Sequence, residues 1–270
     1  MTIKVTKLSD QGTTNPIVAR MTVQSSDILD AFPIKTDIKE KIFSVHLNLC
    51  TRLLEMKKFE TWLQHEYDEI KSNFLLHGLE KVGADAFETP QIIGLETRVE
   101  TFLQSSKLSI RDCGSFFGMI FGERFGHRFD KIIKWAKRQF GENDDFFKWI
   151  EGNGLWIKQV IDMRNALEHP TDEPRGCLFI QNVDFTFSGG KASGSDPVWF
   201  LTGDPPSSLV ADTQMLNKNL LNFAEDLLAI SLLKKYPEVP LDIQEIPLEE
   251  RDLKCPVRLQ LVPRGYLLSA

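Results

Sequence analysis

The chain has 270 residues, of which 42% are hydrophobic and 26% are charged. This balance is typical of a folded globular protein and excludes an intrinsically disordered chain. The formal net charge of −6 excludes a surface that is basic throughout, so nucleic acid would have to bind at a local patch. The longest apolar run, 227–233, is too short to cross a bilayer, and residues 1–10 contain no secretory hydrophobic segment. We therefore expect a cytoplasmic protein that does not contact a membrane.

The cysteines and histidines do not fall into a ligand pattern. The cysteines are spaced too widely for a zinc or redox motif, which indicates reduced and mostly buried thiols. They are Cys50, Cys113, Cys177 and Cys255. The histidines form neither an HExxH nor an HxH pair. From these spacings we expect no metal site and no cofactor.

The N-terminal third combines an extended segment with a long helix. Residues 2–24 are rich in β-branched side chains and are interrupted by a turn cluster at 12–16, which predicts one or two strands. Pro33 marks the end of this extended segment, 1–35. From 36 to about 79, apolar residues recur every three or four positions, which predicts a helix. Because this helix would be unusually long, we expect a break or a kink in it.

The middle of the chain is predicted to be helical, with an unusual glycine pattern. A second helix is predicted over 88–106 and a third over 110–140. Within the third, glycines and phenylalanines each recur at every fourth position, the glycines being Gly114, Gly118, Gly122 and Gly126. We interpret them as a ridge that lets a neighbouring element approach closely; a ligand-binding glycine loop is the alternative. Further helices are predicted over 144–169, with a break near 152–154.

The last third introduces strands. Residues 177–187 and 197–201 predict a β-hairpin whose loop, 188–196, is flexible and rich in glycine and serine. Residues 207–236 predict a helix with one apolar stripe. Residues 239–270 read as extended, pairing with the hairpin or with the N-terminal strands. The predicted fold class is therefore mainly α. A helical domain over 36–236 carries the hairpin at about 177–201, and extended additions flank it at 1–35 and 237–270.

A polar cluster ends the helix predicted over 144–169, in the stretch MRNALEHP (163–170). On a helical wheel Arg164 lies at the edge of the apolar stripe, while Glu168, Asn165 and His169 turn progressively away from it. Arg164 and Glu168 are i, i+4 neighbours, as are Asn165 and His169. The plain interpretation is a solvated helix end. In it, an ion pair forms on the surface and the helix dipole favours the cation of His169.

The same six residues, Arg164-Asn165-Ala166-Leu167-Glu168-His169, resemble the signature of the HEPN superfamily. That signature is an arginine, often followed by a polar residue, with a histidine four to six positions further on. The resemblance implies a helical bundle and, as in many members, a metal-independent endoribonuclease that acts as a homodimer. Many members belong to bacterial toxin–antitoxin or phage-defence systems, so a cognate antitoxin or defence partner is implied besides RNA. The extended segments and the hairpin lie outside the family pattern.

The residue types suit RNA cleavage by attack of the 2′-OH. His169 would act as general acid and base, because its ordinary pKa is near the working pH. Arg164 would stabilise the charge on the phosphorane through its planar fork, and Asn165 would orient the phosphate or the histidine. Glu168 would repel the phosphate, so we expect it to pair with Arg164 and hold its fork.

A second feature favours a polyanionic partner. Residues 124–138 are rich in cations and contain a single acid, Asp130. The predicted nucleic-acid-binding residues are Arg124, Arg128, Lys131, Lys134 and Arg138. Because Lys131, Lys134 and Arg138 share one helical face, this face favours contacts with phosphates. The alternative is a solvated helix face whose interleaved aromatic residues belong to the core.

Two other functions remain open from the sequence. The chain could be a non-catalytic helical interaction module, or it could bind a nucleotide through the same motif without cleaving RNA. The ribonuclease hypothesis requires Arg164 and His169 to converge on an open, positively charged groove. The interaction module predicts scattered polar side chains at the motif and an apolar patch elsewhere.

Overall fold

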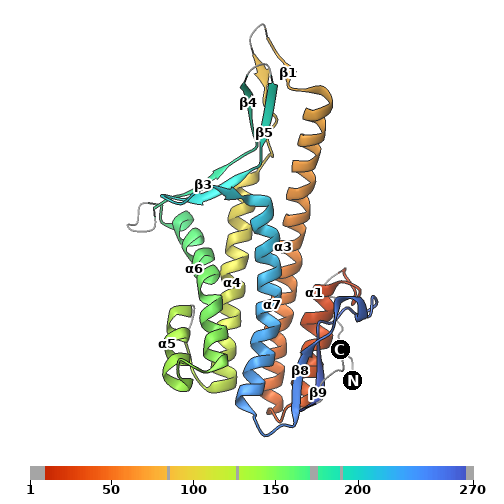
Figure 1. Ribbon diagram of the computed structural model, residues 1–270, viewed down its shortest axis with the longest axis vertical. Coiled ribbons are helices and arrows are strands. Elements are labelled where there is room, and N and C mark those ends of the chain that lie inside the picture. The colour runs from red at the N-terminus through yellow and green to blue at the C-terminus, as the bar shows by residue number, and fades with distance from the viewer. Residues whose placement is uncertain (1–9, 84–85, 126–127, 171–175, 189–190, 266–270) are drawn as a thin grey trace, which may run out of the picture. The chain divides into compact units, whose positions relative to one another are not determined.

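The computed structural model describes residues 10–83, 86–125, 128–170, 176–188 and 191–265, and it is mainly helical (Figure 1). The helical elements, in chain order, are α1 (Pro16–Val18), the π-helical stretch η1 (Ala19–Gln24), α2 (Ser25–Ala31), α3 (Thr36–His77), α4 (Leu95–Phe121), α5 (Phe129–Phe140), α6 (Asp145–Glu168), α7 (Leu209–Lys235) and the 3₁₀ turn η2 (Leu248–Glu250). The strands are β1 (Glu80–Lys81), β2 (Phe87–Glu88), β3 (Leu178–Gln181), β4 (Asp184–Ser188), β5 (Lys191–Ser195), β6 (Val198–Leu201), β7 (Ser207–Ser208), β8 (Leu241–Glu245) and β9 (Leu259–Pro263). Within the part of the chain that is described, no helix combines the length and the apolar character needed to cross a bilayer.

The chain divides into two compact units. Unit 1 consists of Met1–Leu54, Leu108–Ile157 and Leu220–Ala270, and unit 2 of Glu55–Lys107 and Lys158–Asn219. Helices α3, α4, α6 and α7 each contribute residues to both units. The MRNALEHP motif belongs to unit 2, whereas the basic segment 124–138 belongs to unit 1.

The prediction of strands at the N-terminus is wrong for the described residues, since 16–31 are helical. Asn15 caps this segment by accepting a hydrogen bond from the backbone of Ile17 at 2.8 Å, and Pro16 occupies the first turn. Both are helix-start signals that outweigh the β-branched composition. Met21 and Ile28 are buried in the core of unit 1. The rest of the predicted extended segment, residues 1–9, lies outside the described residues.

The long helix is confirmed, but the predicted break is not, because α3 runs unbroken over Thr36–His77. The helices predicted over 88–106 and 110–140 are divided differently. Helix α4 continues to Phe121 and ends before Gly122, whose φ of +82° is a left-handed conformation that suits glycine. The chain then folds back over Gly118, where a Cβ atom would lie 3.2 Å from the Glu123 carbonyl oxygen. Close approach therefore explains this glycine, while Gly126 lies outside the described residues.

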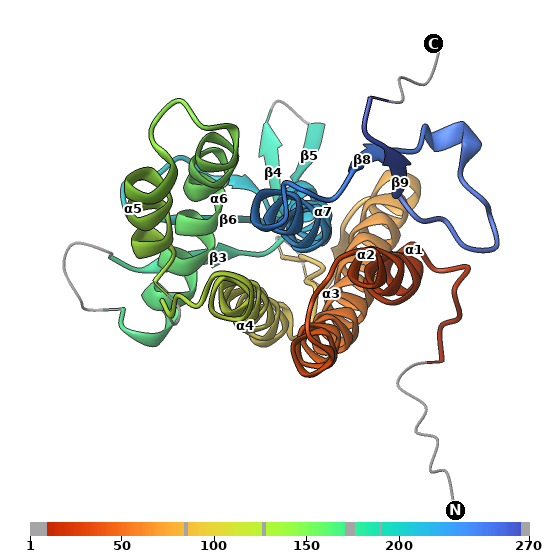
Figure 2. The same cartoon turned by 90° about the horizontal axis from the view of Figure 1, so that it is seen from below.

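Helix α5 packs beside α6 in unit 1 (Figure 2). The expected break in α6 near 152–154 is absent, because the helix runs through both glycines. At Gly154 a Cβ atom would meet the Ile133 Cδ1 atom of α5 at 2.8 Å, so the glycine permits the contact between the helices. The interleaved aromatic residues join the same core: the rings of Phe117 and Trp135 lie 5.6 Å apart.

The predicted hairpin is confirmed. Strands β3 and β6 pair antiparallel from Leu178↔Leu201 to Gln181↔Val198, and β7 pairs with β6. The predicted flexible loop is in part a strand, since β5 pairs antiparallel with β4. Residues 189–190 of that loop lie outside the described residues.

The C-terminal segment is extended, as predicted, but its strands β8 and β9 pair with each other, from Leu241↔Pro263 to Glu245↔Leu259. The expected pairing with the hairpin or with N-terminal strands is therefore wrong for this segment. The β8–β9 hairpin lies beside α1 (Figure 1), and the Gln24 side chain accepts a hydrogen bond from the Arg258 backbone at 2.7 Å.

A buried ionic network fastens this hairpin to unit 1. Glu225 of α7 is 1% exposed and receives hydrogen bonds from Arg20, Gln24 and Arg258. Because two arginines neutralise it and an amide completes its hydrogen bonds, the carboxylate is tolerated in the core.

All four cysteines are free thiols. Cys50 and Cys113 are buried, and burial raises the pKa of Cys50 to about 11 and that of Cys113 still further. Cys177 and Cys255 are partly exposed, and partial burial raises the pKa of Cys255.

Candidate functional site

The motif occupies the end of α6. The His169 backbone N–H donates to the Asn165 carbonyl at 2.8 Å, so the helical hydrogen-bond pattern extends to His169 and stops at Pro170. Val160 and Met163 are buried, as the apolar stripe predicted. The His169 side chain is exposed.

Arg164 is buried, with 8% of the residue exposed, and its guanidinium is held from two sides. The Nε atom donates to Gln104 Oε1 at 2.6 Å, and Nη2 lies 3.0 Å from Glu168 Oε1. The expected pairing of Glu168 with Arg164 is therefore present. The third nitrogen, Nη1, is buried and makes no hydrogen bond to a described residue.

A lysine from α4 completes the cluster. Lys107 Nζ donates to Asn165 Oδ1 at 2.8 Å and to Glu168 Oε2 at 2.9 Å. Sequence reasoning missed both Lys107 and Gln104. A weak signal existed, because a glutamine and a lysine three positions apart flank the buried face of α4.

The charges of this cluster are unequal. The hydrogen bond from Lys107 lowers the pKa of Glu168 below its ordinary value, against an opposing effect of partial burial. The charges of Lys107, Arg164 and His169 also act to lower it. One carboxylate thus faces two permanent cations, and the cluster keeps a net positive charge even when His169 is neutral.

The structure therefore joins Arg164, Asn165, Glu168 and Lys107 in one network of hydrogen bonds and an ion pair within unit 2. His169 follows directly but stays outside that network: among the described residues, its imidazole makes no hydrogen bond to Arg164 or Asn165. An exposed imidazole beside a cationic cluster can exchange protons with solvent or with a ligand.

The basic segment exposes all five predicted nucleic-acid-binding residues, Arg124, Arg128, Lys131, Lys134 and Arg138. Arg128 is paired with Asp130 through two hydrogen bonds of 2.8 Å, which lower the pKa of Asp130 to about 2. Lys131, Lys134 and Arg138 have no ion-pair partner among the described residues. Since the aromatic residues of α5 face the core, this surface offers charge but little ring surface for stacking on bases.

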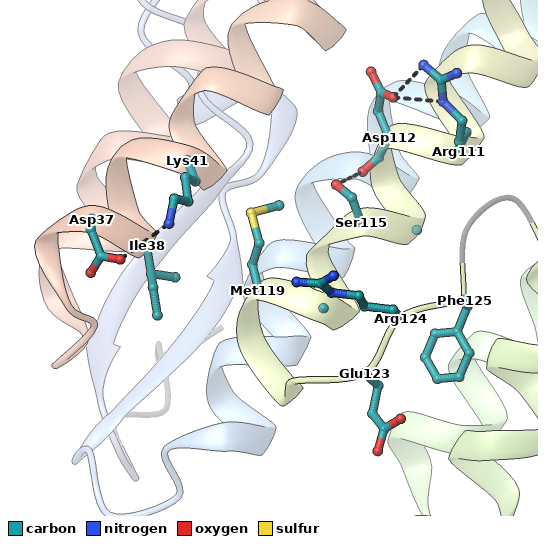
Figure 3. Close-up of a pocket in the computed structure, with 12 residues that line it drawn as sticks. Asp37, Ile38, Lys41, Arg111, Asp112, Ser115, Met119, Glu123, Arg124 and Phe125 are labelled. Atoms are coloured by element: carbon teal, nitrogen blue, oxygen red, sulfur yellow. Dashed lines mark hydrogen bonds and ion pairs between the residues drawn. The ribbon is translucent and has the colours of Figure 1, made fainter.

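A cavity of about 660 Å³ lies in unit 1 between the start of α3 and the end of α4 (Figure 3). Arg124 reaches back across the last turn of α4 beside Met119. The other cations of its wall pair with carboxylates, Lys41 with Asp37 and Arg111 with Asp112, which also pairs with Arg52. The wall is therefore of mixed charge and defines no ligand class.

No family model matches the chain, and neither curated proteins nor solved structures give a significant match.

Proposed function

We propose that the chain is a HEPN-like, metal-independent endoribonuclease. One observation carries the proposal: Arg164 and Asn165 lie in a cluster of net positive charge that directly precedes the exposed His169. This combination offers an anion-binding group and a proton-transfer group within two turns of one helix. Cleavage of RNA by its own 2′-OH requires both.

In this mechanism the 2′-oxygen attacks phosphorus and the bond to the 5′-oxygen breaks, which leaves a 2′,3′-cyclic phosphate and a 5′-hydroxyl. His169 accepts the 2′-OH proton or protonates the leaving 5′-oxygen. Arg164 stabilises the additional charge on the phosphorane, and Asn165 orients the phosphate. A second copy of the chain in a homodimer supplies the other histidine, since one motif holds only one.

The partners follow from this assignment. We propose a cytoplasmic homodimer that binds RNA, with the exposed cations of α5 contacting phosphates outside the cleaved bond. A toxin or phage-defence role implies a cognate antitoxin or defence protein.

The first test is cleavage of a mixed RNA substrate in EDTA by the wild type, His169→Ala, Arg164→Ala and Arg164→Lys. We expect each substitution to reduce cleavage by about 10²–10⁴-fold, because each removes proton transfer or the bidentate fork. Arg164→Lys keeps the positive charge of this buried residue, so it tests the loss of the guanidinium fork with less risk of unfolding the protein. His65→Ala, which alters an exposed histidine of α3 in the same unit, should cleave as the wild type does.

Circular dichroism and the measured oligomeric state confirm that each variant is folded and assembled. A wild type that cleaves none of a varied set of RNAs, or a His169→Ala variant as active as the wild type, would rule out the ribonuclease.

A non-catalytic interaction module is the second candidate, and two observations favour it over nucleotide binding through the same motif. Arg164 is largely buried and already paired with Gln104 and Glu168. Exposed apolar side chains also gather in unit 2 at the end of α3, where Leu75 and Leu76 are 73% and 75% exposed. If the wild type is inactive in the cleavage assay, this second candidate is the function that we retain.

A further inference from the structure

Glu168 occupies a position that the proposed reaction needs for a phosphate. Its two oxygens contact different cations: Oε1 forms an ion pair with Arg164 Nη2 at 3.0 Å, and Oε2 accepts a hydrogen bond from Lys107 at 2.9 Å. Two cationic donors that grip two oxygens of one anion form the arrangement that proteins also use for phosphate. The carboxylate therefore stands where two phosphate oxygens would be held.

Two further donors are unused. Arg164 Nη1 is buried without a hydrogen bond to any described residue, and only 9% of the Arg164 side chain is exposed. The side-chain amide nitrogen of Asn165 also donates to no described residue, while the amide oxygen accepts from Lys107. A carboxylate has two oxygens and leaves such donors unsatisfied, whereas a phosphate offers more acceptors.

We propose that Lys107, Arg164 and Asn165 form a binding site for a phosphate group, and that the Glu168 carboxylate occupies this site as an internal competitor. This inference rests on the proposed function, because the phosphate to be received is the scissile group of RNA. Glu168 can leave without disturbing the core, since its side chain is 35% exposed and lies in the last turn of α6.

The helix dipole does not decide between the two anions. The end of α6 carries partial negative charge, which disfavours any anion there and favours the cations. Glu168 is held against this field by Lys107 and Arg164, and a phosphate would be held by the same pair. Removing the carboxylate charge should therefore strengthen phosphate binding rather than abolish it.

The test is a calorimetric titration of inorganic phosphate into the full chain at low ionic strength. We expect Glu168→Gln, which keeps the shape and removes the charge, to bind phosphate about tenfold more tightly than the wild type. Asp162→Asn is the matched control, because it removes a carboxylate from the same helix that pairs with Lys158 instead. This control should bind phosphate as weakly as the wild type.

A second variant tests whether the gain in phosphate affinity arises at Lys107. Adding Lys107→Gln to Glu168→Gln should return the affinity to the wild-type level, since one of the two gripping cations is lost. Thermal unfolding with and without phosphate shows that each protein is folded. The proposal is overturned if Glu168→Gln gains no affinity, if Asp162→Asn gains as much, or if the double variant keeps the gain.

Phosphate affinity and RNA cleavage are separable readouts. Phosphate binding requires no proton transfer, so His169→Ala should still bind phosphate after losing cleavage. If the chain shows the expected phosphate affinities but cleaves no RNA, the ribonuclease proposal is rejected and the phosphate-site proposal is supported. If the chain cleaves RNA but Glu168→Gln does not change the affinity for phosphate, only the proposal that Glu168 competes with phosphate is rejected.

Discussion

Gly152 and Gly154 lie two positions apart in α6, but only Gly154 is packed closely against another side chain. A Cβ atom at Gly152 would meet no atom within 4 Å, whereas at Gly154 it would meet Ile133 Cδ1 at 2.8 Å. Glycine inside a helix costs about 1 kcal/mol relative to alanine. At Gly154 the glycine permits the contact with α5, while at Gly152 nothing nearby requires it.

We predict that Gly152→Ala stabilises the protein by about 0.5–1 kcal/mol through helix propensity. Gly154→Ala should lose this gain, because Ile133 must move to admit the methyl group. Urea unfolding measures both free energies. Ile133→Val removes the Cδ1 methyl that clashes with the methyl group added by Gly154→Ala, so the double variant should be more stable than the sum of the two single changes predicts. If the changes in unfolding free energy simply add, the clash is not the cause.

Periodicity predicted part of the candidate site at this scale. The position of Arg164 at the edge of the apolar stripe follows from the helical wheel, and so does its i, i+4 pair with Glu168. The contacts of Gln104 and Lys107 could not be predicted in this way. Which residues of α4 face α6 depends on how two helices pack, and the local sequence of either helix leaves that open.

At the scale of elements, the β8–β9 hairpin is held by few but strong contacts. Arg258 lies just before β9 and pairs with Glu225, Asp226 and Glu245. Glu225 is buried whereas the Glu245 side chain is 56% exposed, so one arginine makes both a buried and a surface ion pair. Their energetic contributions should differ accordingly.

We predict that Glu225→Gln destabilises the protein by about 3–5 kcal/mol, because it leaves the buried Arg20 without its counter-ion and removes one of the three carboxylates that pair with Arg258. Glu245→Gln should cost less than about 1 kcal/mol, since solvent screens that pair. Equilibrium denaturation of the two variants provides the comparison. If the two variants lose equal free energies of unfolding, the burial of Glu225 does not strengthen its ion pairs.

The sequence predicted elements best where one periodicity ran uninterrupted, as in α3, α7 and the β3–β6 hairpin. It failed at the N-terminus, where β-branched residues suggested strands although Asn15 and Pro16 begin a helix. It also placed helix boundaries wrongly around α4, because glycines inside a helix and glycines that end one look alike in sequence. Gly118 permits a close approach, while Gly122 ends the helix through its positive φ.

At the scale of the whole molecule, a buried histidine links stability to pH. His46 is fully buried beside Phe116, their ring centroids being 5.0 Å apart. Burial lowers the pKa of His46 from 6.5 to about 4, against a smaller opposing effect of the Ala224 backbone. Between these values the unfolded chain binds a proton that the folded chain does not, so stability falls as pH decreases through this window.

We predict that His46 alone removes roughly 3 kcal/mol of stability between about pH 6.5 and pH 4. His46→Leu should therefore flatten the dependence of the unfolding free energy on pH over this range. Denaturation at a series of pH values measures it, with the exposed His65→Ala as the control that leaves the curve unchanged. Parallel curves for His46→Leu and the wild type would contradict the assignment.

The unequal exposure of the four thiols has a practical consequence for spectroscopy. Cys50 and Cys113 are shielded, so a maleimide dye is directed to the two partly exposed cysteines. The Cys177 thiol donates to the Pro170 carbonyl at 3.0 Å, and Pro170 follows His169 directly. With Cys255 replaced by serine, a fluorophore on Cys177 would sit beside the candidate site, where its emission could follow ligand binding without an introduced cysteine.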